Sequence, residues 1–265
     1  MKKYSFFFVY ELAALVDDAA GEQSSFSRID WSNPDVVRRL RRFSKDTVLH
    51  HFIYQTVSAH QYERANRDGD KIACDEREKI DLLEEALKEY SINIEPYGPY
   101  VARASGNARN HGYPVDCYTP WYENNRASFD QLWAALTPEV FHILFPNRSF
   151  LLKFNLTLSK YLSLGKAMLP PDILTSKGFI KRDKNFPSWL KKAVYFRENG
   201  RCTFCSVDLS GLLSTDRQIH LDHIVPLARF GINDPSNIQL LCQTCNLKKL
   251  MSEGATSTRY APWWD

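Results

Sequence analysis

Hydrophobic positions recur at helical spacing over much of the first 170 residues of this chain. Residues 1–16 are largely apolar and predict a buried strand or a short helix. Asn33-Pro34-Asp35 is a helix-start signal, and the segment after it carries apolar residues at intervals of three or four as far as His60. Residues 75–90 predict a second helix with an acidic outer face. Further helices are expected over 128–136, 138–145 and 149–168.

The segment 91–127 interrupts this pattern, because it is rich in Gly, Pro, Asn and Tyr and shows no periodicity. It predicts a long loop, and long loops inside domains are often functional or dependent on a partner. Its aromatic side chains either stack on nucleobases or pack within the loop. They are Tyr97, Tyr100, Tyr113, Tyr118, Trp121 and Tyr122.

Residues 170–187 hold basic residues between prolines and predict a linker. A helix capped by Ser188 and closed by Gly200 should follow. Two strand-like stretches and a short helix come next, over 219–227, 237–241 and 243–251.

These elements indicate an α+β protein in two parts. A mostly helical domain for recognition or docking is expected over 1–169, and a small mixed domain over 188–265.

Composition narrows the class of protein. The chain has 265 residues, of which 44% are hydrophobic and 25% charged, as in ordinary globular proteins. No apolar run reaches the ~18 residues of a membrane span. Glu11 and Asp17-Asp18 argue against a signal peptide, so a cytoplasmic location is expected. The net charge is +3, and residues 176–265 carry 13 basic against 8 acidic residues, which mildly favours a polyanionic partner.

Four of the six cysteines form two Cys-x-x-Cys pairs, Cys202/Cys205 and Cys242/Cys245, separated by 36 residues. This spacing suits a structural zinc ion held by four thiolates, with each pair on a tight turn. Redox chemistry at one pair is the alternative, and the second pair argues against it. A domain of this size has little core of its own, so zinc should contribute directly to its folding.

The residues between the two cysteine pairs carry a more specific pattern. Leu221-Asp222-His223-Ile224-Val225-Pro226 is followed by Asn237-Ile238-Gln239-Leu240-Leu241-Cys242 and then by Cys245-Asn246-Leu247-Lys248-Lys249. With its flanking cysteines, this stretch resembles the HNH endonuclease family and its ββα-metal fold. The resemblance covers the C-terminal third of the chain only.

The resemblance implies a role for each polar residue. His223 is the expected general base that activates water, and Asp222 and Asn246 are the expected ligands of a catalytic Mg²⁺ or Mn²⁺ ion. Asn237 should fix the loop and orient the base. The residue types suit this chemistry, because carboxylate and amide oxygens are hard ligands. Asn at position 246, where the family often has His, favours Mg²⁺ or Mn²⁺ over zinc.

Several basic residues are candidates for contacts with nucleic acid. The alternative for each is that it has a structural role or lies on a solvent-exposed face. The candidates nearest the motif are His220, Arg229, Lys248 and Lys249. A second face beside the first cysteine pair would comprise Lys191, Lys192, Arg197 and Arg201.

The sequence therefore predicts a metal-dependent endonuclease that cleaves DNA, with RNA as the other possible substrate. A phosphate-seeking site reads little sequence, so target choice should lie in residues 1–169 or in another protein subunit bound there. A nuclease subunit of a microbial anti-phage or RNA-guided CRISPR complex is favoured. A standalone restriction-type endonuclease and a non-catalytic zinc-dependent nucleic-acid-binding protein are the alternatives.

Overall fold

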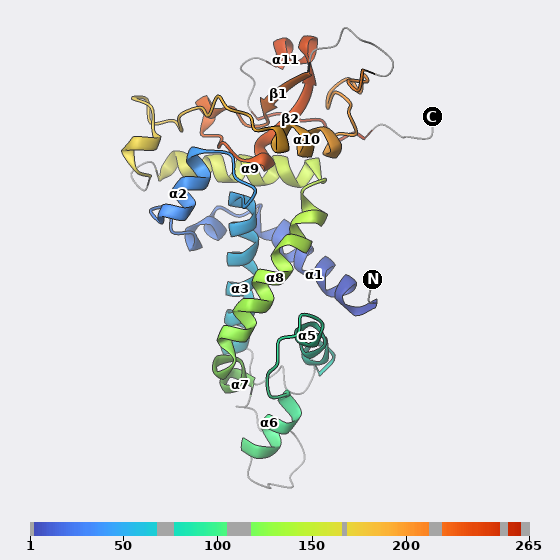
Figure 1. The fold of residues 1–265 in the computed structure, drawn as a ribbon. Helices are drawn as coiled ribbons and strands as arrows, with labels where there is room; N and C mark the ends of the chain where they lie inside the picture. The colour runs from blue at the N-terminus through green and yellow to red at the C-terminus, as the bar shows by residue number, and fades with distance from the viewer. Residues whose placement is uncertain are drawn as a thin grey trace. The chain divides into compact units, whose positions relative to one another are not determined.

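A computed structural model describes residues 3–67, 77–104, 118–165, 169–211, 219–249 and 254–260 (Figure 1). The α-helices are α1 (Lys3–Ala19), α2 (Pro34–Arg41), α3 (Val48–Arg67), α5 (Arg77–Glu89), α6 (Tyr97–Ala104), α7 (Tyr118–Asn124), α8 (Arg126–Leu144), α9 (Arg148–Leu164), α10 (Ser188–Arg197) and α11 (Gln243–Lys249). The strands are β1 (Ile219–His223) and β2 (Ile238–Cys242). This confirms the expected α+β class, with a mostly helical chain and a small sheet near the C-terminus. None of the described helices is long and apolar enough to span a bilayer.

Local signals account for the first helices. Residues 3–19 form a helix, and its buried side chains at Val9, Leu12, Ala13 and Val16 follow a helical repeat. The helix-start signal before α2 is confirmed, because the Asn33 side chain accepts a hydrogen bond from the Asp35 amide at 2.9 Å.

Element boundaries differ from the expected ones in three places. The segment after residue 33 forms two helices, α2 and α3, instead of a continuous run. The helix α8 continues through Pro138, where two helices were predicted. The helix α10 has Pro187 at its N-cap, so Ser188 is its first residue and does not cap it.

The predicted long loop over 91–127 is wrong in its described parts, because α6 and α7 lie within it. The aromatic residues expected there are buried, namely Tyr97, Tyr100, Tyr118, Trp121 and Tyr122. Tyr113 lies outside the described residues. These short helices show no hydrophobic periodicity in their sequence, and they are buried because their large aromatic rings pack against one another.

The chain divides into two compact units. The first comprises Met1–Val16 and Ile53–Val140, and the second comprises Asp17–Phe52 and Phe141–Asp265. The core of the first unit is aromatic: Trp121 packs edge-on against Phe129 at 5.3 Å between ring centroids, and its indole N–H donates to the Glu95 carbonyl at 2.8 Å.

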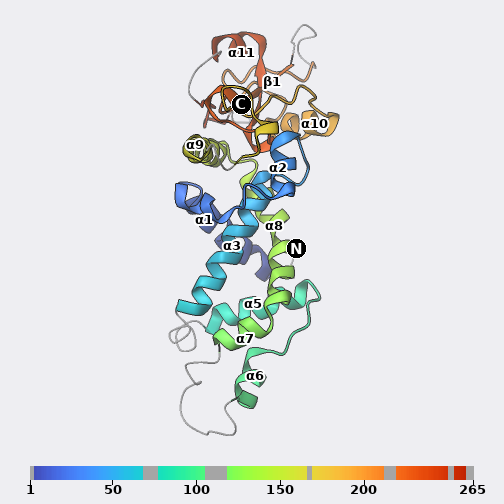
Figure 2. The same cartoon turned by 90° about the vertical axis from the view of Figure 1, so that its left-hand side faces the viewer.

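The second unit joins the C-terminal hairpin to α2, α9 and α10. Figure 2 views α9 end-on, with β1 and α11 above it. A single apolar cluster combines Phe43, which follows α2, with Leu190 and Val194 of α10 and with Ile238 and Leu240 of β2. The core of the C-terminal domain therefore contains a residue from the first fifth of the chain.

Two buried polar residues reinforce this arrangement within the second unit. Asn233 donates to the carbonyls of Leu40 at 3.3 Å and Lys181 at 2.8 Å. Asp234 accepts from the Val48 amide at 2.7 Å. Residues on both sides of the linker expected at 170–187 thus belong to one contact unit, and a boundary between independently folding domains there stays a prediction.

Candidate active site

The four paired cysteines converge on one point. Their sulfur atoms all lie within 4.8 Å of one another, and Cys205 Sγ is 3.7 Å from Cys242 Sγ. Zinc–thiolate bonds of about 2.3 Å arranged tetrahedrally place sulfurs about 3.8 Å apart. The group therefore fits a structural metal ion such as zinc, as the spacing of Cys202, Cys205, Cys242 and Cys245 predicted.

Strand β1 carries the acidic residue of the predicted site. It pairs antiparallel with β2, in a register that sets Asp222 opposite Gln239. Gln239 is fully buried, and its amide nitrogen lies 3.4 Å from Asp222 Oδ2 and donates to the Ala255 carbonyl at 2.9 Å. Lys249 of α11 contacts the same oxygen, with Nζ 2.6 Å from Asp222 Oδ2. The carboxylate is thus held between the second strand and the last helix.

His223 ends β1 and is 4% exposed. Its ring takes part in a side-chain hydrogen bond with Asn233, and its Nε2 atom has no partner among the described residues. Burial, with a smaller contribution from the positive charge of Arg182, lowers the pKa of His223 to about 4. The imidazole is therefore neutral near pH 7, with one ring nitrogen uncommitted.

Asp222 and His223 share a cavity of about 560 Å³. One wall comes from the segment expected to be a linker, through Thr175, Phe179, Ile180 and Arg182. This segment is ordered by an isolated bridge between Leu174 and Ile180. The turn after β1 and Lys249 also line the cavity, and the turn contributes Pro226, Leu227, Ala228 and Arg229.

The loop between the strands is fastened by Asn237, which is fully buried. Its Oδ1 atom accepts from the Val225 amide at 2.8 Å, and its Nδ2 atom donates to the carbonyls of Val225 and Ile232, both at 3.0 Å. The Asn237 carbonyl also accepts from the Ile224 amide at 2.6 Å. These bonds hold the two residues that directly follow His223.

The remaining candidate residues do not all line the cavity. Arg229 is exposed at the cavity wall, whereas Asn246 is half-buried on α11 and is not among the described residues that line the cavity. Asn246 precedes Lys249 by three residues, so the two share one face of the helix. Lys248 is exposed on the same helix. His220 lines a different groove, beside α10.

Arg197 is not available for phosphate. Its side chain is 1% exposed and pairs with Glu198 at 2.7 Å. Glu198 also binds Arg148 of α9, whose Nε lies 2.6 Å from its carboxylate. Arg197 further donates to the carbonyls of Pro235, in the turn before β2, and of Ile238, the first residue of β2. It is a buried structural residue. The predicted second basic face therefore retains only Lys191, Lys192 and Arg201, which are exposed.

A comparison with known protein families assigns the same part of the chain that carries the cysteine cluster and the cavity residues Asp222 and His223. Residues 202–250 match the model of a family described as HNH endonuclease. The C-terminal part of the chain is an HNH domain. No similar curated protein and no similar solved structure was found for the chain. The HNH domain indicates a nuclease, and its match spans both cysteine pairs, both strands and α11.

Three residues around the site, one of them outside the matched HNH residues, had no functional signal in the sequence. Arg182 lines the cavity but lies in a stretch whose sequence looks like a linker. Its positive charge is the one feature of the sequence that suggests a role. Asn233 and Gln239 are inside the match, but they were interpreted as a turn residue and a strand residue. Their contacts with His223 and Asp222 follow from strand register and from loop folding, which spacing alone does not give.

Proposed function

We propose that the protein is a metal-dependent HNH endonuclease that hydrolyses phosphodiester bonds in DNA. The observation that supports this best is the pairing, in one cavity, of Asp222 with a buried neutral histidine whose Nε2 is uncommitted. A hydrolytic nuclease needs a base for water and positive charge for the phosphate. The cavity offers His223 for the first need and Arg182 and Arg229 for the second.

His223 acts in this proposal as the general base. Its low pKa keeps the ring able to accept a proton at neutral pH. A phosphate entering the cavity would raise that pKa, because a nearby negative charge favours the imidazolium form. Asn233 orients the ring, and Asn237 holds the loop behind it.

Asp222 and Asn246 would hold the catalytic cation, Mg²⁺ or Mn²⁺. Asp222 lines the cavity, and Asn246 lies one helical turn from Lys249, which already contacts Asp222. A cation bound there supplies charge stabilisation for the scissile phosphate and the leaving oxygen. Lys248, Lys249, Arg229 and His220 are the proposed contacts to the nucleic-acid backbone.

For the biological setting we propose a cytoplasmic nuclease component of an anti-phage or RNA-guided CRISPR complex. Residues 1–169 would dock its other subunits or select the target, because the small cavity has few groups that could read bases. The competing readings are a standalone restriction-type endonuclease and a non-catalytic zinc-dependent binding protein.

One assay tests the assigned base and separates a nuclease from a non-catalytic binding protein. Purified protein is incubated with supercoiled plasmid and Mg²⁺ or Mn²⁺, beside His223→Ala and a matched control, His142→Ala, whose histidine is exposed outside the cavity. The proposal expects nicking by wild type and by the control, and loss of at least about 100-fold in rate for His223→Ala. Equal cleavage by His223→Ala would refute the assigned base. Zinc-loaded protein that binds DNA but never cuts it would favour the binding protein.

A further inference from the structure

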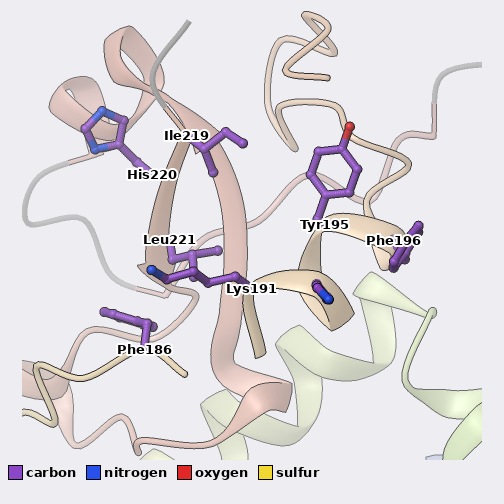
Figure 3. A pocket seen from close by; sticks show the side chains of 8 residues that line it. Phe186, Lys191, Tyr195, Phe196, Ile219, His220 and Leu221 are labelled. Atoms are coloured by element: carbon purple, nitrogen blue, oxygen red, sulfur yellow. The ribbon is translucent and has the colours of Figure 1, made fainter. Parts of the chain in front are cut away.

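A second groove lies in the second unit between α10 and β1, about 670 Å³ in volume (Figure 3). It is separate in its lining residues from the cavity that holds His223. Tyr195 and Phe196 stand on the α10 side, and Ile219 and Leu221 stand on the strand side. The groove uses no residue of the catalytic proposal except the outlying His220.

The groove exposes aromatic and aliphatic surface that a folded protein usually buries. Phe196 is 72% exposed and Ile219 is 49% exposed. The Tyr195 ring is fixed against Gly200, where a Cβ atom would come within 2.6 Å of the Tyr195 hydroxyl. Apolar surface of this kind with a charged rim marks a binding surface.

The charge of the groove is of one sign. Lys191 and Lys192 are exposed among its described lining residues, which include no acidic side chain. Aromatic rings beside lysines suit a ligand that carries both flat bases and phosphates, as single-stranded nucleic acid does. An acidic or apolar protein surface would match only one of these two features.

Strand β1 contributes residues to both the groove and the catalytic cavity. Its first three residues line the groove, and its last two line the cavity. Three residues of extended chain cover about 10 Å. A stacked strand rises about 3.4 Å per nucleotide, so the two sites are about three nucleotides apart.

We propose that the α10–β1 groove binds the strand being cleaved, about three nucleotides from the scissile phosphate. Bases stack against Tyr195 and Phe196, and Lys191 and Lys192 contact the phosphates. Stacking and phosphate contacts are blind to sequence, so the groove would add affinity for unpaired strand without choosing a site. This inference rests on the proposed nuclease function, because it takes the occupant to be the substrate strand.

The test measures binding of a fluorescent single-stranded oligodeoxynucleotide to the full-length protein by anisotropy, without added divalent cation. The double variant Tyr195→Ala/Phe196→Ala should bind at least about tenfold more weakly, and Tyr195→Phe should bind like wild type. Lys191→Ala/Lys192→Ala should reduce the slope of log affinity against log salt by about 1.4. Leu164→Ala and Lys88→Ala, exposed residues outside the groove, are the controls and should bind like wild type. Every variant must keep the wild-type zinc content and circular dichroism.

Photocrosslinking gives a second readout that loss of folding cannot imitate. An oligonucleotide carrying 5-bromodeoxyuridine should crosslink to the peptide that contains Tyr195 and Phe196. Crosslinks confined to other peptides, or groove variants that bind like wild type, would overturn the inference. So would groove variants that alter only the sedimentation of the protein, since that outcome assigns the groove to contact with a second copy.

The two proposals can fail separately. If plasmid is cleaved through His223 while groove variants bind and cleave normally, the nuclease stands and the groove does not. If groove variants lose oligonucleotide binding but wild type never cleaves with Mg²⁺ or Mn²⁺, the groove is a single-strand binding site without a substrate strand, and the nuclease proposal is refuted.

Discussion

Lys249 Nζ lies 2.6 Å from the Asp222 carboxylate oxygen Oδ2, and the same nitrogen donates to the His223 carbonyl. The Lys249 side chain is only 5% exposed, so this ion pair is largely shielded from water. The last helix is thereby tied to the end of β1. The ammonium group also binds the carboxylate that we assign to the catalytic cation, so the two positive charges would compete.

Replacing Lys249 should therefore change the cation requirement. In Lys249→Met, the Mg²⁺ concentration for half-maximal plasmid cleavage should fall several-fold, because no ammonium competes for Asp222. The maximal rate should fall as well, since a positive group near the phosphate is lost. Cation titration of plasmid nicking measures both. Lys248→Met, on the exposed neighbour, should leave the cation requirement unchanged, and a raised requirement in Lys249→Met would contradict the competition.

The cysteine cluster predicts one tightly bound zinc ion per chain. Cys242→Ala should abolish stoichiometric zinc and lower the midpoint of thermal unfolding, because the metal joins the first cysteine pair to the end of β2. Elemental analysis and calorimetry measure the two effects. Cys74→Ser, outside both Cys-x-x-Cys pairs in the sequence, is the control and should retain zinc. Retention of full zinc by Cys242→Ala would show that the metal is held elsewhere.

Local sequence signals predicted the elements of the HNH domain well. Cysteine spacing and short strand-like stretches bounded by turn residues are short-range patterns, and they located the knuckles, β1 and β2 to within a few residues. The helix cap at Asn33 could also be predicted, because it too depends on a short-range sequence pattern. In contrast, α6 and α7 are short and polar or aromatic, and they are stabilised by tertiary packing that no local period reveals.

The surroundings of the site could not be predicted, because they depend on contacts far apart in sequence. Asp234 reaches the Val48 amide across 186 positions, and Phe43 joins the core of the HNH domain. The basic run before residue 187 suggested a linker, yet Arg182 lines the cavity. An arginine on a solvated segment and one facing an active site have the same local sequence, so only folding separates them.

The turn after β1 depends on a glycine. A Cβ atom at Gly231 would lie 1.9 Å from the Val225 carbonyl oxygen. Gly231→Ala should therefore lower the free energy of unfolding by about 3 kcal/mol and reduce cleavage, because the loop behind His223 must shift. Gly98→Ala is a matched control, since a Cβ there meets nothing within 4 Å. Urea denaturation compares them, and equal stability of the two variants would refute the close approach.

The partly buried side chain of His50 predicts that the free energy of unfolding decreases at acidic pH. Burial lowers its pKa from 6.5 to about 4; the ring stacks on Phe141 at 3.9 Å, and Nδ1 lies 2.8 Å from Thr47 Oγ1. A depressed pKa means that the folded state resists protonation, so stability present above pH 6.5 is lost as the pH falls toward 4.

Between pH 7 and pH 5, the stability advantage of wild type over His50→Gln should shrink by about 2 kcal/mol. Denaturant titrations at both pH values measure the difference, and zinc content must be unchanged at pH 5. A stability gap that stays constant with pH would mean that His50 is protonated equally easily in the folded and unfolded chain.

The contacts of Asn233 and Asp234 predict that the C-terminal domain does not fold well alone. A fragment of residues 188–265 keeps the cysteines, strands and α11, but it loses Phe43 and the Asn233 and Asp234 partners at Leu40, Lys181 and Val48. Exposed apolar surface and unpaired buried polar groups should make it aggregate or unfold even with zinc. Full-length Asn233→Ala should show a milder loss, about 1–3 kcal/mol, with lower nicking activity. Heteronuclear NMR of the zinc-loaded fragment decides the matter: well-dispersed, stable spectra would establish the boundary at 170–187 as a true domain boundary.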